Sequence, residues 1–230
     1  MPRFARCVFA VFLAVSCLSS SLTCQAAAPE TAAAAFILME AGSGRVLASR
    51  NETQERSIAS TTKIMTCILA LEKGNPKDLV TASANAVAQP KVHLGMHEGE
   101  AFYLGDLLYS LMLESHNDTA AAIAEHVAGS VEAFAGLMNE KAAELGCTDS
   151  HFANPSGLND PNHYVSAYDM ALIAKAAFNN PTFVEVDSTT YYDVPAGKLK
   201  QYPDGWRYYA HHRMLRRNDS LYYDLSLIHI

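Results

Sequence analysis

A lysine inside a mostly apolar stretch is the feature that most constrains how this chain can fold. The stretch runs from Ile58 to Leu71, ends near Gly74, and contains Ser60 and Lys63 as a Ser-x-x-Lys tetrapeptide. It predicts a buried helix, on which residues three apart share one face. A lysine buried there is costly unless it is partnered or neutral. Beside a serine at the start of a helix, such a lysine is a candidate proton acceptor for the hydroxyl.

The tetrapeptide alone is weak evidence, because Ser-x-x-Lys also fits a helix cap followed by a solvated lysine. A second polar motif, Ser115-His116-Asn117, follows Ser60 by 55 residues and lies between two apolar segments. Serine and asparagine are ordinary residues at helix ends, so an N-cap at Asn117 or Asp118 also explains this motif taken alone. Together with the buried pair, the motif offers a hydroxyl that can relay a proton and an amide that can hold a peptide group.

The N-terminus, residues 1–27, has the layout of a secretory signal. Arg3 and Arg6 precede an apolar stretch from Val8 to Leu18, and small residues follow up to Ala27. A membrane anchor is the alternative, but this eleven-residue stretch is too short to cross a bilayer core that needs about 20 residues. We therefore expect residues 28–230 to form a domain outside the cytoplasm.

Composition and charge narrow the classes of function. Half of the 230 residues are apolar, which suffices for one sizeable core. The net charge is −7, and removal of the two signal arginines lowers it to −9. Because phosphate binding requires clustered lysine and arginine, this balance argues against a nucleic-acid partner.

The cysteines and histidines predict neither a disulfide framework nor a metal centre. Outside the signal the only cysteines are Cys67 and Cys147, which are too few for a disulfide scaffold. We expect both to be small, unbridged thiols. His93 and His97 are four apart, but no third ligand stands at a convincing spacing for zinc.

The predicted elements are a hairpin, then helices, then strands. Residues 36–48 read as a β-hairpin around a glycine-bearing turn. After Asn180-Pro181 the segment around 189–194 is aromatic and predicts strands. This order fits an α/β fold in which an antiparallel sheet is built from both chain ends and a helical lobe is inserted between them. The helical segments are expected at 58–71, 107–113, 119–128, 131–145 and 170–178. The last of these is opened by a sequence that resembles a capping box at Ser166 and is ended by Asn180-Pro181, and Asn154-Pro155-Ser156-Gly157 predicts a turn.

Longer segments around the two motifs carry a family resemblance. They read Ala59-Ser60-Thr61-Thr62-Lys63-Ile64-Met65-Thr66, Leu111-Met112-Leu113-Glu114-Ser115-His116-Asn117-Asp118, Phe152-Ala153-Asn154-Pro155-Ser156-Gly157-Leu158 and His163-Tyr164-Val165-Ser166-Ala167-Tyr168-Asp169. Over nearly all of residues 28–230 the chain resembles the low-molecular-weight penicillin-binding proteins, which are serine-type D-alanyl-D-alanine carboxypeptidases. The pairing of Ser-x-x-Lys with Ser-x-Asn is a known signature of penicillin-binding proteins and β-lactamases.

The resemblance implies a penicillin-binding-protein/β-lactamase (transpeptidase-like) fold and a reaction through an acyl-enzyme. The terminal D-alanine would be removed from peptidoglycan stem peptides, and β-lactams would bind covalently as inhibitors. Ser60 would be the nucleophile, Lys63 its general base, Ser115 the proton shuttle and Asn117 the residue that orients the substrate. The backbone N–H of Ser60 would form half of the oxyanion hole. No metal or cofactor is implied.

One motif of that family is missing from the 230 residues. The Lys-Thr-Gly of a sheet strand does not occur, residues 213–224 resemble the family just before that motif, and residues 225–230 resemble nothing there. We therefore expect a domain truncated before the third motif and inactive as it stands. The family's later strands and its C-terminal membrane-associating segment would be absent too. His116 occupies a position at which the family usually has a small residue.

Two alternatives stay open. A serine β-lactamase shares both motifs, but it needs a dedicated deacylating carboxylate, and no Glu-x-x-Leu-Asn follows Asn117. A catalytically silent wall-binding protein, or a fragment without activity, is favoured by the missing third motif.

Overall fold

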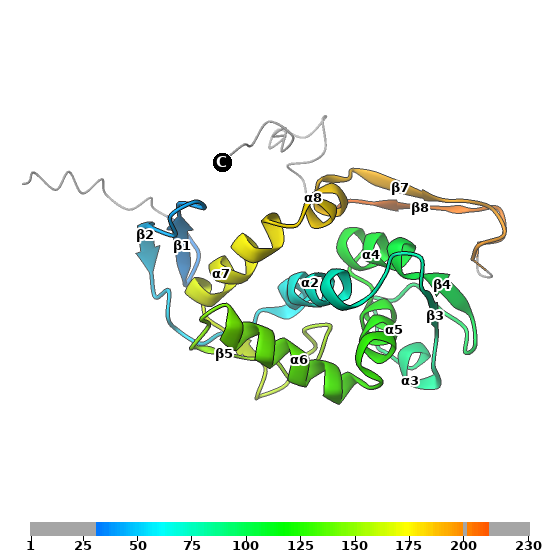
Figure 1. Ribbon diagram of the computed structural model, residues 1–230, viewed down its shortest axis with the longest axis horizontal. Helices are drawn as coiled ribbons and strands as arrows, with labels where there is room; N and C mark the ends of the chain where they lie inside the picture. The colour runs from blue at the N-terminus through cyan, green and yellow to red at the C-terminus, as the bar shows by residue number, and fades with distance from the viewer. Residues whose placement is uncertain (1–30, 200–201, 212–230) are drawn as a thin grey trace, which may run out of the picture. The chain divides into compact units, whose positions relative to one another are not determined.

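The apolar stretch that contains Lys63 forms a short turn followed by a buried helix. The computed structural model describes residues 31–199 and 202–211 (Figure 1). In this structure Ala59–Thr62 form the 3-10 turn η1, and Lys63–Lys73 form helix α2, which ends at Gly74 as predicted. The predicted signal at 1–27 and the segments at 213–224 and 225–230 lie outside the described residues.

The remaining elements follow the predicted order, with helices inserted between hairpins, and the four further predicted helices are present with slightly shifted ends. The helices are α3 (Ala84–Val87), α4 (Leu104–Leu113), α5 (Asn117–Ala128), α6 (Val131–Glu144), α7 (Ala167–Phe178) and α8 (Pro181–Ser188). The strands are β1 (Phe36–Met39), β2 (Val46–Arg50), β3 (Leu79–Thr81), β4 (Ala101–Tyr103), β5 (Ser150–His151), β6 (Tyr164–Val165), β7 (Tyr191–Val194) and β8 (Trp206–Tyr209).

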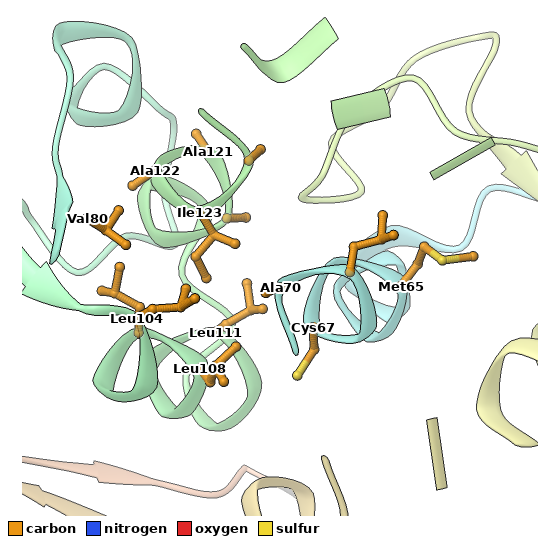
Figure 2. Close-up of a cluster of buried hydrophobic side chains, with 14 of the residues drawn as sticks. Met65, Cys67, Ala70, Val80, Leu104, Leu108, Leu111, Ala121, Ala122 and Ile123 are labelled. Atoms are coloured by element: carbon orange, nitrogen blue, oxygen red, sulfur yellow. The ribbon is translucent and has the colours of Figure 1, made fainter. Parts of the chain in front are cut away.

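Helix α2 lies at the centre of the core and contacts α4, α5, α6, α7 and α8. Figure 2 shows Leu108 and Leu111 of α4 and Ile123 of α5 in one cluster with Ala70 of α2. Burying a leucine or isoleucine side chain stabilises the fold by roughly 1.5–3 kcal/mol. The core therefore contacts α2 on several sides. The buried apolar residues of α2, each at most 3% exposed, are Met65, Cys67, Ile68, Leu69 and Ala70.

The strands form separate two-stranded antiparallel sheets, in which β1 pairs with β2, β3 with β4, β5 with β6 and β7 with β8. The β1–β2 hairpin keeps the predicted turn, where the Glu40 carboxylate accepts the N–H groups of Gly42 at 2.8 Å and Ser43 at 2.6 Å. β1 contacts α7, whereas β7 and β8 contact α4. The prediction that both ends supply strands is confirmed, but within the described residues these two hairpins do not pair with each other.

Asn180-Pro181, predicted only as a helix end, also opens a further helix, α8, that the sequence did not predict. Asn180 instead caps α8, because its Oδ1 accepts the N–H groups of Thr182 at 2.9 Å and Phe183 at 3.3 Å. Proline at the first helical position is favourable, since its fixed φ suits the helix and its missing N–H needs no partner there. No helix in the described part of the chain combines the length and the apolarity needed to span a membrane.

Candidate active site

Ser60 lies on the exposed side of turn η1, directly before the buried start of α2. Ala59 precedes it in the left-handed region, at a φ of 47°. Thr61 Oγ1 donates to the carbonyl of Ile58 at 2.7 Å, and the backbone N–H of Lys63 donates to the carbonyl of Ser60. These bonds fix the backbone of the turn, so the Ser60 hydroxyl projects from a defined position.

The Lys63 side chain is only 2% exposed, as the sequence predicted, and it makes three hydrogen bonds. Its Nζ lies 3.2 Å from Ser60 Oγ, 2.9 Å from Asn117 Oδ1 and 2.8 Å from the carbonyl oxygen of Ser156. Two of these partners are carbonyl oxygens, which can only accept. They hold two N–H groups of the amine, so the third position on nitrogen faces the Ser60 hydroxyl. In the neutral amine that third position is a lone pair.

Burial brings the neutral amine within reach of ordinary pH. Desolvation lowers the pKa of Lys63 from 10.5 to about 8, because a low-dielectric environment disfavours the charged form. Among the described residues no carboxylate forms an ion pair with Lys63. A lysine in this state can accept the proton of a neighbouring serine, which is how a weak hydroxyl nucleophile is activated.

Asn117 joins the second motif to the first. Its Oδ1 accepts from Lys63 Nζ, and its Nδ2 donates to the carbonyl of Pro90 at 3.0 Å. The side chain therefore does not cap α5, and the N-cap interpretation of the motif is wrong. The N-cap position is His116, which makes no side-chain capping bond.

Ser115 occupies the loop between α4 and α5 in the left-handed region, at a φ of 61°, and is half-buried. Its hydroxyl makes no hydrogen bond to the other described residues, and its backbone strain is of the kind that clusters at functional sites. The structure thus brings three of the four predicted site residues into one hydrogen-bonded group, Ser60, Lys63 and Asn117, and leaves Ser115 beside it.

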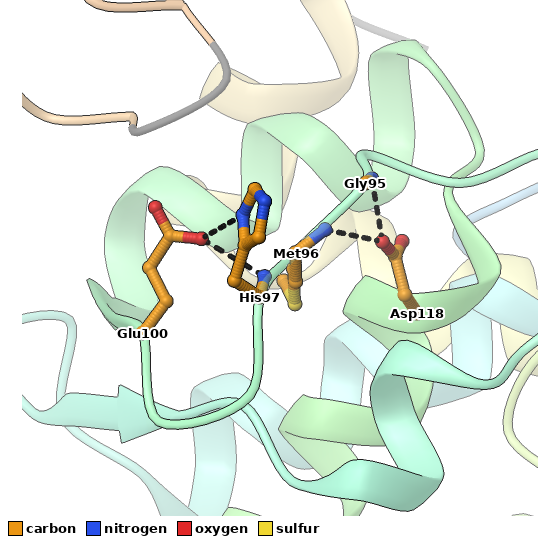
Figure 3. Close-up of polar contacts among 5 residues, drawn as sticks. All are labelled: Gly95, Met96, His97, Glu100 and Asp118. Carbon is orange, nitrogen blue, oxygen red and sulfur yellow. Dashed lines mark hydrogen bonds and ion pairs between the residues drawn. The ribbon is translucent and has the colours of Figure 1, made fainter.

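Asp118 is a residue that the sequence analysis considered only as a cap. Its fully buried carboxylate accepts the backbone N–H groups of Leu94 at 2.9 Å, Gly95 at 2.8 Å and Met96 at 3.2 Å; Figure 3 shows the last two contacts. Hydrogen bonds to an ionised acceptor are strong, so three of them fix this loop against the start of α5. The same loop supplies the carbonyl that takes the Asn117 amide, so Asp118 supports the position of Asn117.

The predicted turn at 154–157 forms another side of the site. Asn154 Oδ1 accepts the N–H groups of Ser156 at 3.2 Å, Gly157 at 2.8 Å and Leu158 at 3.1 Å. This ordered turn presents the Ser156 carbonyl to Lys63. The sequence indicated the turn, but it carried no signal for the contact, because any residue type could supply that carbonyl.

His116 points into the core. It is 7% exposed, its Nδ1 lies 2.8 Å from Ser110 Oγ, and its ring meets that of Tyr208 edge to face with centroids 6.0 Å apart. Burial is the main cause that lowers the pKa of His116 to about 4, so the ring is neutral at pH 7. The large side chain at this position of the motif is thus accommodated inside the protein.

The other candidate ligands do not assemble. Within residues 31–199 and 202–211, no group of three or more histidine, cysteine or acidic side chains forms a metal site. Cys67 and Cys147 are both free thiols. His97 Nδ1 lies 3.4 Å from Glu100 Oε2. A cavity of about 170 Å³ lies between β3, β4, α4, β7 and β8, and neither Ser60 nor Lys63 lines it.

Sequence comparison identifies the relatives of this chain. A family described as D-alanyl-D-alanine carboxypeptidase, peptidase family S11, matches residues 22–219. The chain is 40% identical over 144 residues to the D-alanyl-D-alanine carboxypeptidase DacF of Bacillus subtilis, covering 60% of this chain and 37% of the relative. It is 31% identical over 196 residues to DacD of Salmonella typhimurium, covering 80% and 50%. The chain therefore spans half or less of the length of these two relatives.

Solved structures show the same fold. A D-alanyl-D-alanine carboxypeptidase from Mycobacterium tuberculosis superposes with a TM-score of 0.76 at 28% identity, covering 84% of this chain and 72% of that one. Penicillin binding protein 6B from Escherichia coli gives a TM-score of 0.74 at 28% identity, covering 87% and 64%. These likenesses confirm the predicted penicillin-binding-protein fold. With its two motifs joined at Lys63, the chain belongs to the peptidase S11 family of D-alanyl-D-alanine carboxypeptidases.

Proposed function

We propose that this site transfers an acyl group from a D-alanyl-D-alanine peptide to Ser60. The observation that carries the proposal is the Lys63 amine, which two carbonyl oxygens hold so that its third position faces Ser60 Oγ at 3.2 Å. Neutral Lys63 takes the hydroxyl proton while Oγ attacks the carbonyl carbon of the penultimate D-alanine. The tetrahedral adduct carries a negative oxygen, which the backbone N–H of Ser60 helps to stabilise.

Collapse of the adduct breaks the C–N bond to the terminal D-alanine, and the departing amine needs a proton. Ser115 relays that proton from Lys63 in this proposal, which is supported by its place beside Asn117 and by a hydroxyl that makes no hydrogen bond to the other described residues. Water then hydrolyses the Ser60 ester and regenerates the hydroxyl. Asn117 Nδ2 has two N–H groups, of which one is used by Pro90, so the other can donate to a peptide carbonyl of the substrate.

The substrates that fit this chemistry are peptidoglycan stem peptides, and β-lactams are expected to acylate the same serine and to remain bound as covalent inhibitors. Such substrates lie outside the cytoplasm, in agreement with the signal layout of residues 1–27. The family relationship and the joined Ser60–Lys63 pair support this assignment.

Residues 28–230 alone are expected to be inactive or nearly so. The 230 residues contain no Lys-Thr-Gly, whose lysine would hold the substrate carboxylate and whose strand would give the second oxyanion donor. Loss of one oxyanion donor costs roughly 10²–10³ in rate.

Labelling with a fluorescent penicillin tests the proposal. Residues 28–230 and the same chain extended through a native third motif are compared for labelling and for D-alanine release from a D-alanyl-D-alanine peptide. In the extended chain, mass spectrometry should place the adduct on the peptide that contains Ser60, and an adduct on Ser115 would overturn the proposed roles of the two serines. Equal activity of both chains would show that the third motif is dispensable. Rapid penicillin hydrolysis without D-alanine release would favour a β-lactamase. If neither substrate reacts, a wall-binding protein would be favoured.

A further inference from the structure

His163 belongs to neither catalytic motif, yet it lies between the Ser60 turn and the 153–158 loop. It is 3% exposed. Its Nδ1 accepts the backbone N–H of Ala153 at 3.1 Å, and its Nε2 lies 2.7 Å from Thr62 Oγ1. The ring packs against Phe152 in a T-shaped arrangement with centroids 5.6 Å apart. The imidazole is therefore held at both nitrogens and along its ring.

These contacts determine where the proton of His163 lies. A backbone N–H can only donate, so the Nδ1 that receives the Ala153 N–H carries no proton. The proton of the neutral ring is then on Nε2, and Nε2–H donates to Thr62 Oγ1. A second proton would face the Ala153 N–H, so the arrangement requires the neutral ring. Burial acts in the same direction, because it lowers the pKa of His163, against a smaller opposing effect of Asp160.

The hydrogen bonds of His163 form one of two connections between the 153–158 loop and the Ser60 turn. In this connection the Ala153 N–H donates to His163, and His163 donates to Thr62. In the other connection, the carbonyl of Ser156, three residues after Ala153, accepts from Lys63, the residue after Thr62. The loop and the turn are thus tied at two points, one through an imidazole and one through the amine that is to act as the base.

We infer that His163 is a positioning residue for the acyl transfer proposed above, on which this inference rests. Its Nε2–H holds Thr62 and keeps the turn of the nucleophile in register with the loop that orients the base. His163 touches neither the substrate nor a reacting atom in this assignment. Its effect reaches Ser60 through the distance between Ser60 Oγ and Lys63 Nζ, on which proton transfer depends.

The proton position can be tested without any activity. Long-range ¹H–¹⁵N spectra of residues 28–230, with the His163 signals identified by their loss in His163→Gln, should show a bare Nδ1 and a protonated Nε2 at neutral pH. A protonated Nδ1, or a ring that exchanges between both forms, would overturn the inference.

The positioning role is tested by penicillin acylation of the chain extended through a native third motif. His163→Phe keeps an aromatic ring and removes both hydrogen bonds, and Thr62→Val removes the acceptor with little change in shape. Each should lower the acylation rate constant by about 10–100-fold, which is the effect of displacing a reacting group by about 1 Å. The dissociation constant of the noncovalent penicillin complex should stay unchanged. The double variant should lose little more than either single variant, because both break one contact. The matched control is His151→Phe, since His151 is exposed and its side chain contacts the Asn162 carbonyl and the Tyr164 ring.

A second substitution of the same residue, His163→Gln, distinguishes a loss of positioning from a loss of folding. Its amide can still donate toward Thr62, so acylation should be faster than in His163→Phe. If His163→Phe does not fold, a His163→Gln variant with the wild-type acylation rate and a weakened Thr62 contact would overturn the inference. Additive losses in the double variant, or equal losses in the His151→Phe control, would also overturn it. If penicillin does not acylate the wild-type chain extended through a native third motif, the proposed function and the positioning role are both overturned, whereas the proton position would stand.

Discussion

A side chain at position 157 would collide with the carbonyl group of Ala59. A Cβ built on Gly157 comes within 1.8 Å of that oxygen and 2.8 Å of Thr62 Oγ1. Gly157 also has a φ of +84°, in the region that glycine enters without steric cost. The absence of a side chain therefore lets the 153–158 loop lie directly against the turn that carries Ser60.

Gly157→Ala should reduce both stability and acylation, because the loop must move away from the turn. A matched control is Gly129→Ala, since Gly129 has a φ of +83° and a Cβ placed there would meet nothing within 4 Å. The control should lose only the cost of the left-handed backbone, roughly 1–2 kcal/mol, and keep its acylation rate. Urea unfolding and penicillin labelling measure the two effects. Equal losses in both variants would contradict the close-approach argument.

Acylation of Ser60 should become faster as pH rises and should level off above about 8, because the reactive form is the neutral Lys63 amine and its pKa is lowered to about 8. The rate constant for penicillin acylation, followed by stopped flow in an acylation-competent chain, gives this profile. A rate that falls as pH approaches 8 from below would show that the charged amine is the reactive form.

The same lowered pKa predicts a pH-dependent stability. The pKa of Lys63 is about 8 in the folded chain and 10.5 when exposed, so between these values the unfolded state binds more protons. The free energy of unfolding should therefore rise with pH across this window. Lys63→Met should lack that rise, and parallel pH profiles for the two proteins would contradict the assignment.

Asp118→Asn should loosen the loop that holds Asn117. The amide offers one acceptor oxygen where the carboxylate offers two, so at least one of the three backbone N–H groups loses its partner. We expect a loss of about 1–3 kcal/mol in the free energy of unfolding and slower acylation. Asp204→Asn makes the same charge change at an exposed position and should leave both unchanged. An unaffected acylation rate in Asp118→Asn would separate this loop from the site.

Two free thiols should be found in unfolded, non-reduced residues 28–230. Cys67 is fully buried inside α2, and Cys147 is half-buried with its pKa raised to about 12 by burial. Folded protein should therefore react slowly with a thiol reagent at pH 8, since the thiolate is the reactive form. Titration with and without denaturant measures both states, and an absence of thiols after unfolding would indicate a bridge.

The sequence predicted the parts of this fold that are encoded locally. The apolar run around Lys63, the Gly74 stop and the Ser166 cap of α7 all follow from neighbouring residues, and the structure confirms them. The N-terminal cap of α8 was also readable, because Asn180 precedes a proline and two buried apolar residues, but the pair was interpreted only as a helix end.

The partners of Lys63 were harder to predict, for a physical reason. Asn117 is 54 residues away and Ser156 is 93 residues away, and the latter contributes only a backbone carbonyl. Every residue has a backbone carbonyl, so the residue type does not indicate which carbonyl will bind the amine. Only the tertiary packing of the helices decides which one meets the amine, just as it decides that Asn117 binds Lys63 and does not cap α5.

The wide separation of the groups around Lys63 has a consequence for the order in which the chain is made. Ser60 leaves the ribosome early, and the carbonyl that helps to fix its neighbouring amine follows 93 residues after that lysine. In the partly synthesised chain Ser60 is an ordinary alcohol with a solvated, protonated lysine beside it. Under the proposed mechanism Ser60 becomes reactive only when the distant segments have docked, so an incomplete chain carries the proposed nucleophile in an unreactive state.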